Sequence, residues 1–180
     1  MSTSATTAPS AAATPGSARE DAPWHAAFPT PRSSLADGSL ASMTPRELKD
    51  LMEQQQVLEE RDFLVVDVRR TDFENACIKG AINLPAHSFY PTLPALVPIL
   101  SRYRQVFFHC QSSSGRGPRC AAWYQDYLND LDASTPSQSA TEPPESGEGG
   151  EPLSKAVVLE GGIKAWVKEF GDDETVTVAL

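Results

Sequence analysis

The sequence predicts an α/β domain built on a parallel sheet, because short apolar runs alternate with amphipathic helical stretches. Three predicted strands each contain a continuous apolar run, at residues 62–69 (DFLVVDVR), 106–108 (VFF) and 155–159 (KAVVL). Continuous rather than alternating apolar character is typical of strands that helices cover on both faces. The stretches between these runs supply such helices.

The first element is a helix that begins near residue 44 and extends to about Leu58. The sequence TPRE at 44–47 combines a capping box with a proline at the first helical position, and both features are typical of helix starts. Leu48, Leu51 and Met52 form the face that this helix buries. The predicted strand at 62–69 follows it.

Three further strands and the helical stretches that follow them complete the domain. Residues 80–85 (GAINLP) contain a short strand that proline stops, and the prolines at 91, 94 and 98 punctuate a helical or irregular connection to the strand at 106–108. The next helix has an apolar face formed by Cys120, Trp123, Tyr124, Tyr127, Leu128 and Leu131. After the strand at 155–159, two glycines make a turn into a last helix, whose apolar face consists of Ile163, Trp166, Val167 and Phe170.

Composition sets the expected domain boundaries. Residues 1–42 are mostly Ser, Thr, Ala and Pro, and an insert at about 132–154 adds Glu and Gly. Neither stretch has enough apolar surface to offset the entropy of ordering it, so both are expected to be disordered. The folded domain is expected at 43–174, followed by a C-terminal tail at 175–180. The acidic insert contributes strongly to the net charge of −9.

The chemistry centres on HCQSSSGR at residues 109–116, between a predicted strand and a predicted helix. Backbone N–H groups of such a loop can turn inward around an oxyanion, and the first helical turn adds its dipole. The same field stabilises the thiolate of Cys110, the candidate nucleophile. Five residues separate Cys110 from Arg116, a spacing that lets the guanidinium hold two oxygens of the anion. The candidate substrate-binding residues are Gln111, Ser112, Ser113, Ser114, Gly115 and Arg116.

The charge pattern around this loop favours an anionic substrate. No Asp or Glu lies between Glu74 and Asp126. The same stretch holds five basic residues, namely Lys79, Arg102, Arg104, Arg116 and Arg119. A nearby carboxylate would repel an anion, so an acid-free stretch suits one. Chance clustering is the alternative explanation.

The loop and its surroundings resemble a known family. HCQSSSGRGPRC resembles the HCxxSxxRGP motif of rhodanese-fold phosphatases, the branch that contains the cell-division-cycle dual-specificity phosphatases and the eukaryotic arsenate reductases. VVDVRRTDFENACIKGAINLPA resembles the rhodanese signature, and VVLEGGIKAW resembles the strand, turn and helix that close that fold. The resemblance implies a rhodanese-like parallel five-stranded sheet flanked by helices on both faces.

The same resemblance implies roles for individual residues. Cys110 matches the family nucleophile, Arg116 the oxyanion-binding arginine and Ser113 the loop serine. Asp67 and Arg69 match a structural ion pair of the signature. The glutamate that precedes the arginine in the cell-cycle enzymes is Gly115 here, which removes one candidate proton donor for a leaving alcohol.

We expect structural rather than catalytic roles for three other residues. Cys77 replaces the histidine that the family usually has in its GHI sequence, and it is expected to pack there. Cys120 lies on the apolar face of its helix, which favours a place in the core over a redox role. His109 is expected to make structural hydrogen bonds, because the alternation of a strand points it away from the loop.

The leading interpretation is a cysteine-dependent phosphatase of the protein phosphotyrosine or dual-specificity type, acting through a covalent cysteinyl-phosphate intermediate. The alternative is a thiol-dependent arsenate reductase that uses the same loop. A thiosulfate sulfurtransferase ranks lower, because such enzymes usually have one residue fewer between the cysteine and the position of Arg116. A non-catalytic rhodanese-like binding module also ranks lower, because catalytically inactive members of the family tend to lose the nucleophilic cysteine, whereas Cys110 and Arg116 are both present here.

The phosphatase and arsenate reductase interpretations imply particular substrates and cofactors. The substrate is expected to be an anion that carries phosphate or arsenate, with a phosphoprotein as one candidate, and neither nucleic acid nor a membrane is an expected partner. No metal and no cofactor is expected, apart from an external thiol reductant in an arsenate reductase. No apolar run approaches the ~20 residues of a membrane span, and no hydrophobic signal core precedes the domain, so the cytoplasm or nucleus is the expected compartment.

Overall fold

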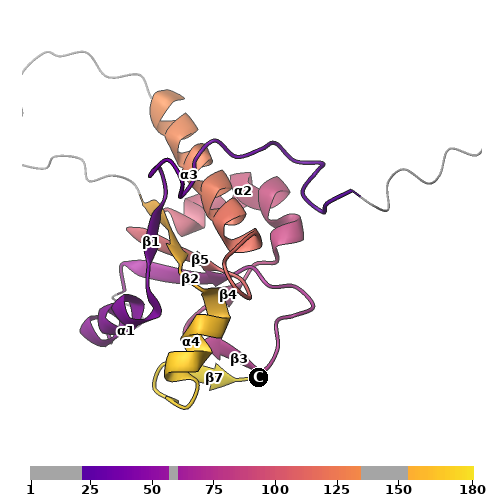
Figure 1. Ribbon diagram of the computed structural model, residues 1–180. Coiled ribbons are helices and arrows are strands. Elements are labelled where there is room, and N and C mark those ends of the chain that lie inside the picture. Colours follow the sequence, from indigo (N-terminus) through magenta and orange to yellow (C-terminus); the bar gives the residue numbers. More distant parts are fainter. Residues whose placement is uncertain (1–21, 57–60, 135–153) are drawn as a thin grey trace, which may run out of the picture.

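The architecture is a parallel sheet between two layers of helices (Figure 1). The structure is a computed structural model, and it describes residues 22–56, 61–134 and 154–180. Five strands form the sheet in the order β1-β6-β5-β2-β4, and all their pairings are parallel. These strands are β1 (Ala41–Met43), β2 (Phe63–Asp67), β4 (Ile82–Asn83), β5 (Gln105–His109) and β6 (Lys155–Leu159). The predicted five-stranded parallel sheet is therefore confirmed.

The helices divide between the two faces of the sheet. They are α1 (Pro45–Gln54), α2 (Ala86–Leu100), α3 (Arg116–Ser134) and α4 (Gly162–Phe170). Side chains of α2 and α3 pack on one face, in a cluster with Val106 and Phe108 of β5. Those of α1 and α4 pack on the other face, in a cluster with Phe107. Successive residues of β5 thus enter opposite cores, which explains why its sequence is apolar throughout.

The start of α1 shows the predicted capping box. The Thr44 hydroxyl accepts a hydrogen bond from the backbone N–H of Glu47, and the Glu47 carboxylate accepts one from the backbone N–H of Thr44. The connection at 86–100 is a continuous helix although it contains three prolines. The expected helix after the loop begins at Arg116 and continues through Ser134, three residues into the stretch predicted as the insert.

Two of the expected boundaries differ from the structure. Residues 22–40 pack against the domain, and Ala41–Met43 form the edge strand β1, whereas a disordered tail was expected up to residue 42. The expected C-terminal tail contains β7 (Thr177–Ala179), which pairs antiparallel with β3 (Ala76–Ile78). Both segments are ordered by hydrogen bonds or aromatic contacts with distant parts of the chain. Their sequences therefore need no helix or strand periodicity, and a search for such periodicity does not identify them. Residues 1–21 and 135–153 lie outside the described residues.

Among the described residues, none of the helices is both long enough and apolar enough to cross a membrane.

Candidate active site

The predicted loop lies at the carboxyl edge of the sheet. β5 ends at His109, Cys110 follows immediately, and α3 begins at Arg116. β2 lies beside β5 in parallel register, with Asp67 opposite His109. Since the carboxyl ends of neighbouring parallel strands meet at one edge, the segment that follows β2 comes close to the Cys110 loop.

The start of α4 holds the carbonyl groups of the loop. The backbone N–H of Ile163 donates to the Cys110 carbonyl at 3.0 Å, and that of Lys164 donates to the Gln111 carbonyl at 3.1 Å. Gly162 permits this contact, because a Cβ atom at that position would lie 2.4 Å from the Cys110 carbonyl oxygen. Its φ of 61° also lies in the left-handed region that favours glycine. These bonds fix which way the loop carbonyls point.

The backbone N–H groups of the loop are unused by the rest of the described chain. None of those of residues 111–115 donates a hydrogen bond to another described residue. Ser113 has a positive φ of 49°, and a left-handed residue within such a loop is the conformation that makes successive N–H groups converge into an anion-binding concavity. The loop can therefore offer several donors to a bound oxyanion.

Arg116 is paired with an acidic residue that the sequence analysis did not identify. Its Nη1 donates to Oδ1 of Asp72 at 2.7 Å, and its Nη2 donates to Oδ2 at 2.5 Å. The two hydrogen bonds from Arg116 hold the pKa of the Asp72 carboxyl well below its usual range. Asp72 is therefore an anion next to the loop. The stretch around Cys110 is free of acids along the chain, but the site is not free of acids in space.

A buried ion pair positions Asp72. The side chain of Arg69 binds Asp67, with Nη2 at 2.7 Å from Oδ2, and both are almost fully buried. This confirms the structural pair that the family resemblance implied. The remaining donors of Arg69 bind the backbone carbonyls of the turn that contains Asp72, at residues 72, 74 and 76. Asp72 could have been identified as a residue near the loop from its position just after the DVR sequence, in a turn that follows the strand next to β5.

A pocket of about 410 Å³ opens in front of the loop. Of the predicted site residues, Cys110, Ser112, Ser114, Gly115 and Arg116 line it. The other lining residues are Trp24, His25, His87 and Arg119. Gln111 and Ser113 do not line the pocket, and their side-chain oxygens are buried without a hydrogen-bond partner in the described part of the chain. Cys110 is only 3% exposed. Cys110 therefore belongs to the wall of a pocket and is not an exposed thiol.

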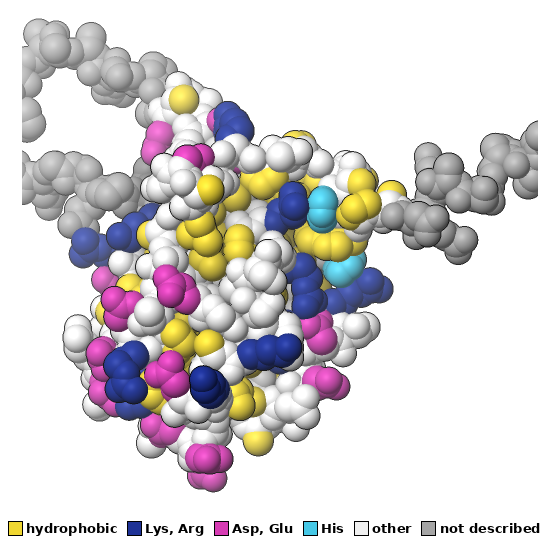
Figure 2. Space-filling view, viewed as in Figure 1, with side chains coloured by type: hydrophobic (Ala, Val, Ile, Leu, Met, Phe, Trp, Pro, Cys, Tyr) yellow, Lys and Arg dark blue, Asp and Glu magenta, His cyan; other side chains and the backbone are white. Residues whose placement is uncertain are grey.

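Hydrophobic, basic and histidine side chains occur together on one flank of the molecule in the space-filling view (Figure 2). His87 packs its ring on that of Trp24, with a centroid separation of 4.9 Å. Burial lowers the pKa of His87, and the nearby charges of Arg70 and Arg116 lower it further. A neutral His87 at physiological pH leaves the positive charge of the pocket to its arginines.

The other two cysteines lie elsewhere. Cys120 is fully buried on α3, and burial raises the pKa of its thiol, so it stays protonated. Cys77 is half-buried on β3. Neither lines the pocket of Cys110. Among the described residues, the pocket thus has a single thiol.

His109 is fully buried behind the loop. Its Nδ1 lies 3.3 Å from the Cys110 carbonyl, and its Nε2 lies 3.7 Å from Oδ2 of Asp67. Burial lowers the pKa of His109. It does not line the pocket, and the hydrogen bond that its ring makes is to the loop backbone, since Nε2 has no hydrogen-bond partner in the described part of the chain.

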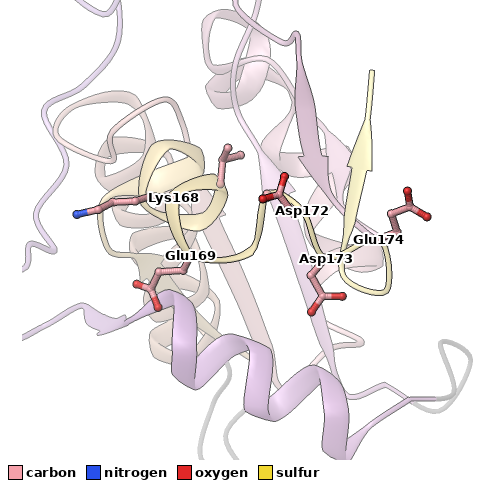
Figure 3. Close-up of a pocket in the computed structure, with 7 residues that line it drawn as sticks. Lys168, Glu169, Asp172, Asp173 and Glu174 are labelled. Atoms are coloured by element: carbon pink, nitrogen blue, oxygen red, sulfur yellow. The ribbon is translucent and has the colours of Figure 1, made fainter.

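A second, larger pocket of about 580 Å³ lies after α4 and has a different character (Figure 3). Its labelled acidic side chains, Glu169, Asp172, Asp173 and Glu174, point in different directions rather than toward a common centre. No group of three or more potential ligands in the described parts of the chain is arranged to hold a metal ion. Carboxylates would repel an anion, so this pocket does not suit a phosphate or arsenate.

Comparison with known proteins agrees with this geometry. A family model for the rhodanese-like domain matches residues 44–169. Arsenical-resistance protein 2 of Saccharomyces cerevisiae is 33% identical over 132 residues, which cover 69% of this chain and 85% of the yeast protein. Dual specificity phosphatase ibp1 of Schizosaccharomyces pombe is 27% identical over 111 residues, which cover 61% of this chain and 78% of that protein.

A solved structure shares the fold. A yeast protein tyrosine phosphatase of the rhodanese family superposes with a TM-score of 0.56 and 25% identity, over 77% of this chain and 92% of that one. Two of these relatives are thus named as phosphatases, and one is named as an arsenical-resistance protein.

Proposed function

The chain belongs to the rhodanese-like family and is a cysteine-based enzyme of that fold, and on this premise we propose that it is a phosphatase acting on phosphate monoesters. The observation that carries the proposal is the pocket, which Cys110 and Arg116 line together beside a loop whose backbone N–H groups make no hydrogen bond to another described residue. A phosphoryl group requires a nucleophile and several donors around its oxygens.

The proposed reaction has two steps. The Cys110 thiolate attacks phosphorus, an S–P bond forms, and the bond from phosphorus to the ester oxygen breaks with release of the alcohol or phenol. Water then attacks phosphorus and releases inorganic phosphate and the thiolate. In both steps Arg116 and the loop N–H groups stabilise the charge on the phosphoryl oxygens.

The groups near the loop favour an ester with a good leaving group. Gly115 provides no proton donor, and Asp72 is held as an anion by Arg116. A phenol has a pKa of about 10, so its anion needs less protonation on leaving than the anion of an aliphatic alcohol. We therefore expect aryl phosphates, such as phosphotyrosine, to react faster than alkyl phosphates.

Arsenate reduction is the second candidate, favoured by the similarity to arsenical-resistance protein 2. Cys110 would attack arsenic with loss of water. An external thiol would then form a disulfide with Cys110 as As(V) is reduced to As(III), and a second thiol would restore Cys110. External thiols are needed because the pocket has one cysteine.

Side-by-side assays of the purified chain separate the candidates. We expect hydrolysis of an aryl phosphate without added thiol, and we expect Cys110→Ser to lower its rate by more than about a thousandfold. Cys77→Ser is the matched control and should keep nearly full activity, because Cys77 lies outside the pocket. Turnover of arsenate alone, and only with added thiol, would favour the reductase. Thiosulfate sulfurtransfer without either activity would contradict both.

A further inference from the structure

Residues 22–33 form an ordered segment that lies outside the family match at 44–169. The segment is anchored on α3 by hydrogen bonds. The indole Nε1 of Trp123 donates to the Pro29 carbonyl at 2.8 Å. The carboxylate of Asp126 accepts from the backbone N–H of Arg32 at 2.6 Å and from the backbone N–H and hydroxyl of Ser33 at 2.9 and 2.7 Å. These bonds fix the path of the segment.

Aromatic contacts bring the segment to the pocket. Phe28 packs against Tyr90 and Trp123, with centroid separations of 5.4 and 5.7 Å. Trp24 meets the edge of Trp123 at 6.0 Å and the ring of His87 at 4.9 Å. Trp24 and His25 then line the same pocket as Cys110. Two aromatic rings, Trp24 from the segment and His87 from α2, thus form one wall of the active-site pocket.

The pocket is larger than the volume that an inorganic oxyanion occupies. Its volume is about 410 Å³, whereas one water molecule in the liquid occupies ~30 Å³. A tetrahedral phosphate, with five heavy atoms held at the loop, fills a small part of that space. Trp24, His87 and Arg119 also line the pocket, and its volume as a whole is within the range of pockets that bind organic ligands.

We propose that Trp24, supported by His87, is a specificity-determining residue that binds the aromatic ring of an aryl phosphate, and that residues 22–33 are a functional part of the active site. This inference rests on the proposed phosphatase function. Offset or edge-on contact of a substrate ring with the indole adds affinity that an alkyl phosphate or an inorganic anion does not gain. The loop, in contrast, binds the phosphoryl group of all of these ligands alike.

Binding to a chain that cannot turn over tests the inference separately from the function. In the Cys110→Ser background, the affinities of inorganic phosphate and of phenylphosphonate, a non-hydrolysable aryl analogue, are measured by calorimetry with and without Trp24→Ala. We expect Trp24→Ala to weaken phenylphosphonate binding by about two- to tenfold, the range of one aromatic contact, with phosphate binding unchanged. Trp24→Phe should restore most of the affinity.

The alternatives give different results. Equal weakening of both ligands, together with a lowered midpoint of thermal unfolding, would assign Trp24 a purely structural role and overturn the inference. Unchanged binding of both ligands would also overturn it, and tighter binding would show that the segment obstructs the pocket. If the Trp24→Ala effect on phenylphosphonate appears but the wild-type chain hydrolyses no aryl phosphate, the phosphatase proposal fails while the aromatic subsite stands.

Discussion

Two arginine–carboxylate pairs lie at the same edge of the sheet, and they differ in burial. The side chains of Arg69 and Asp67 are 2% and 0% exposed, whereas those of Arg116 and Asp72 are 24% and 34% exposed. Both pairs join a guanidinium to a carboxylate: Nε of Arg69 donates to both carboxylate oxygens of Asp67, and the two Nη atoms of Arg116 donate one hydrogen bond each to Asp72. The difference is what surrounds them.

The buried pair has its hydrogen-bonding capacity occupied. Beyond Asp67, Arg69 donates to three backbone carbonyls and fixes the turn that contains Asp72. Arg116 uses two of the five N–H donors of its guanidinium to bind Asp72, and its side chain lines the pocket. Burial therefore separates a pair that holds the fold from one whose arginine remains available to a ligand. Three experiments test this difference.

The largest effect is expected from Arg69→Met. The substitution leaves Asp67 buried without its cation, and breaking a buried pair in this way costs about 3–5 kcal/mol of stability. Urea unfolding followed by circular dichroism measures the loss. Arg70→Met is the matched control, because Arg70 is exposed and adjacent, and it should change stability by less than about 1 kcal/mol. Equal losses of unfolding free energy in both variants would contradict the structural role assigned to the buried pair.

A smaller effect on stability, but a clear one on binding, is expected from Asp72→Asn. The exposed pair contributes at most about 1 kcal/mol to stability, so the unfolding midpoint should change little. The substitution replaces one acceptor oxygen by an amide NH2, so it frees one donor of Arg116, and it takes a negative charge away from the pocket. The inhibition constant of inorganic phosphate against aryl phosphate hydrolysis should fall severalfold, while Asp50→Asn, on α1, leaves it unchanged. Weaker phosphate inhibition would instead make Asp72 a residue that positions Arg116 for the anion.

The smallest effect concerns pH. Arg116 lowers the pKa of Asp72 in the folded state, so the pair stabilises the fold above the unfolded-state pKa of ~3.9, and this contribution is lost as pH falls below that value. The difference in unfolding free energy between wild type and Asp72→Asn should be constant from pH 7 to about pH 5 and decline below about pH 4. Its plateau should not exceed about 1 kcal/mol. A difference that grows on acidification would contradict the assignment of the ion pair.

The elements that could be predicted from sequence are those with a local signal. The apolar runs at 62–69, 106–108 and 155–159 correspond to β2, β5 and β6, and the HCQSSSGR sequence lies between β5 and α3 as expected. Each of these features depends on neighbouring residues along the chain. Local propensity and periodicity are sufficient to identify them.

Asp72 and Trp24 were missed for physical reasons. Asp72 is 44 positions from Arg116 in the chain, and only the pairing of β2 with β5 brings them together. Trp24 and Phe28 lie in a segment rich in Ala and Pro without helix or strand periodicity, so composition suggested disorder. Their order comes from contacts with α2 and α3, which include those of Phe28 with Tyr90 and of Trp24 with Trp123. Tertiary contacts of this kind have no local sequence signature.

The hydrogen bonds from α4 to the loop carbonyls have a consequence for synthesis of the protein. Cys110 leaves the ribosome well before Ile163 and Lys164, whose N–H groups hold the Cys110 and Gln111 carbonyls. A nascent chain that ends before β6 and α4 contains Cys110 but lacks both a neighbouring strand of β5 and the groups that orient the loop. The contacts that hold the loop are therefore complete only after β6 and α4 have been synthesised.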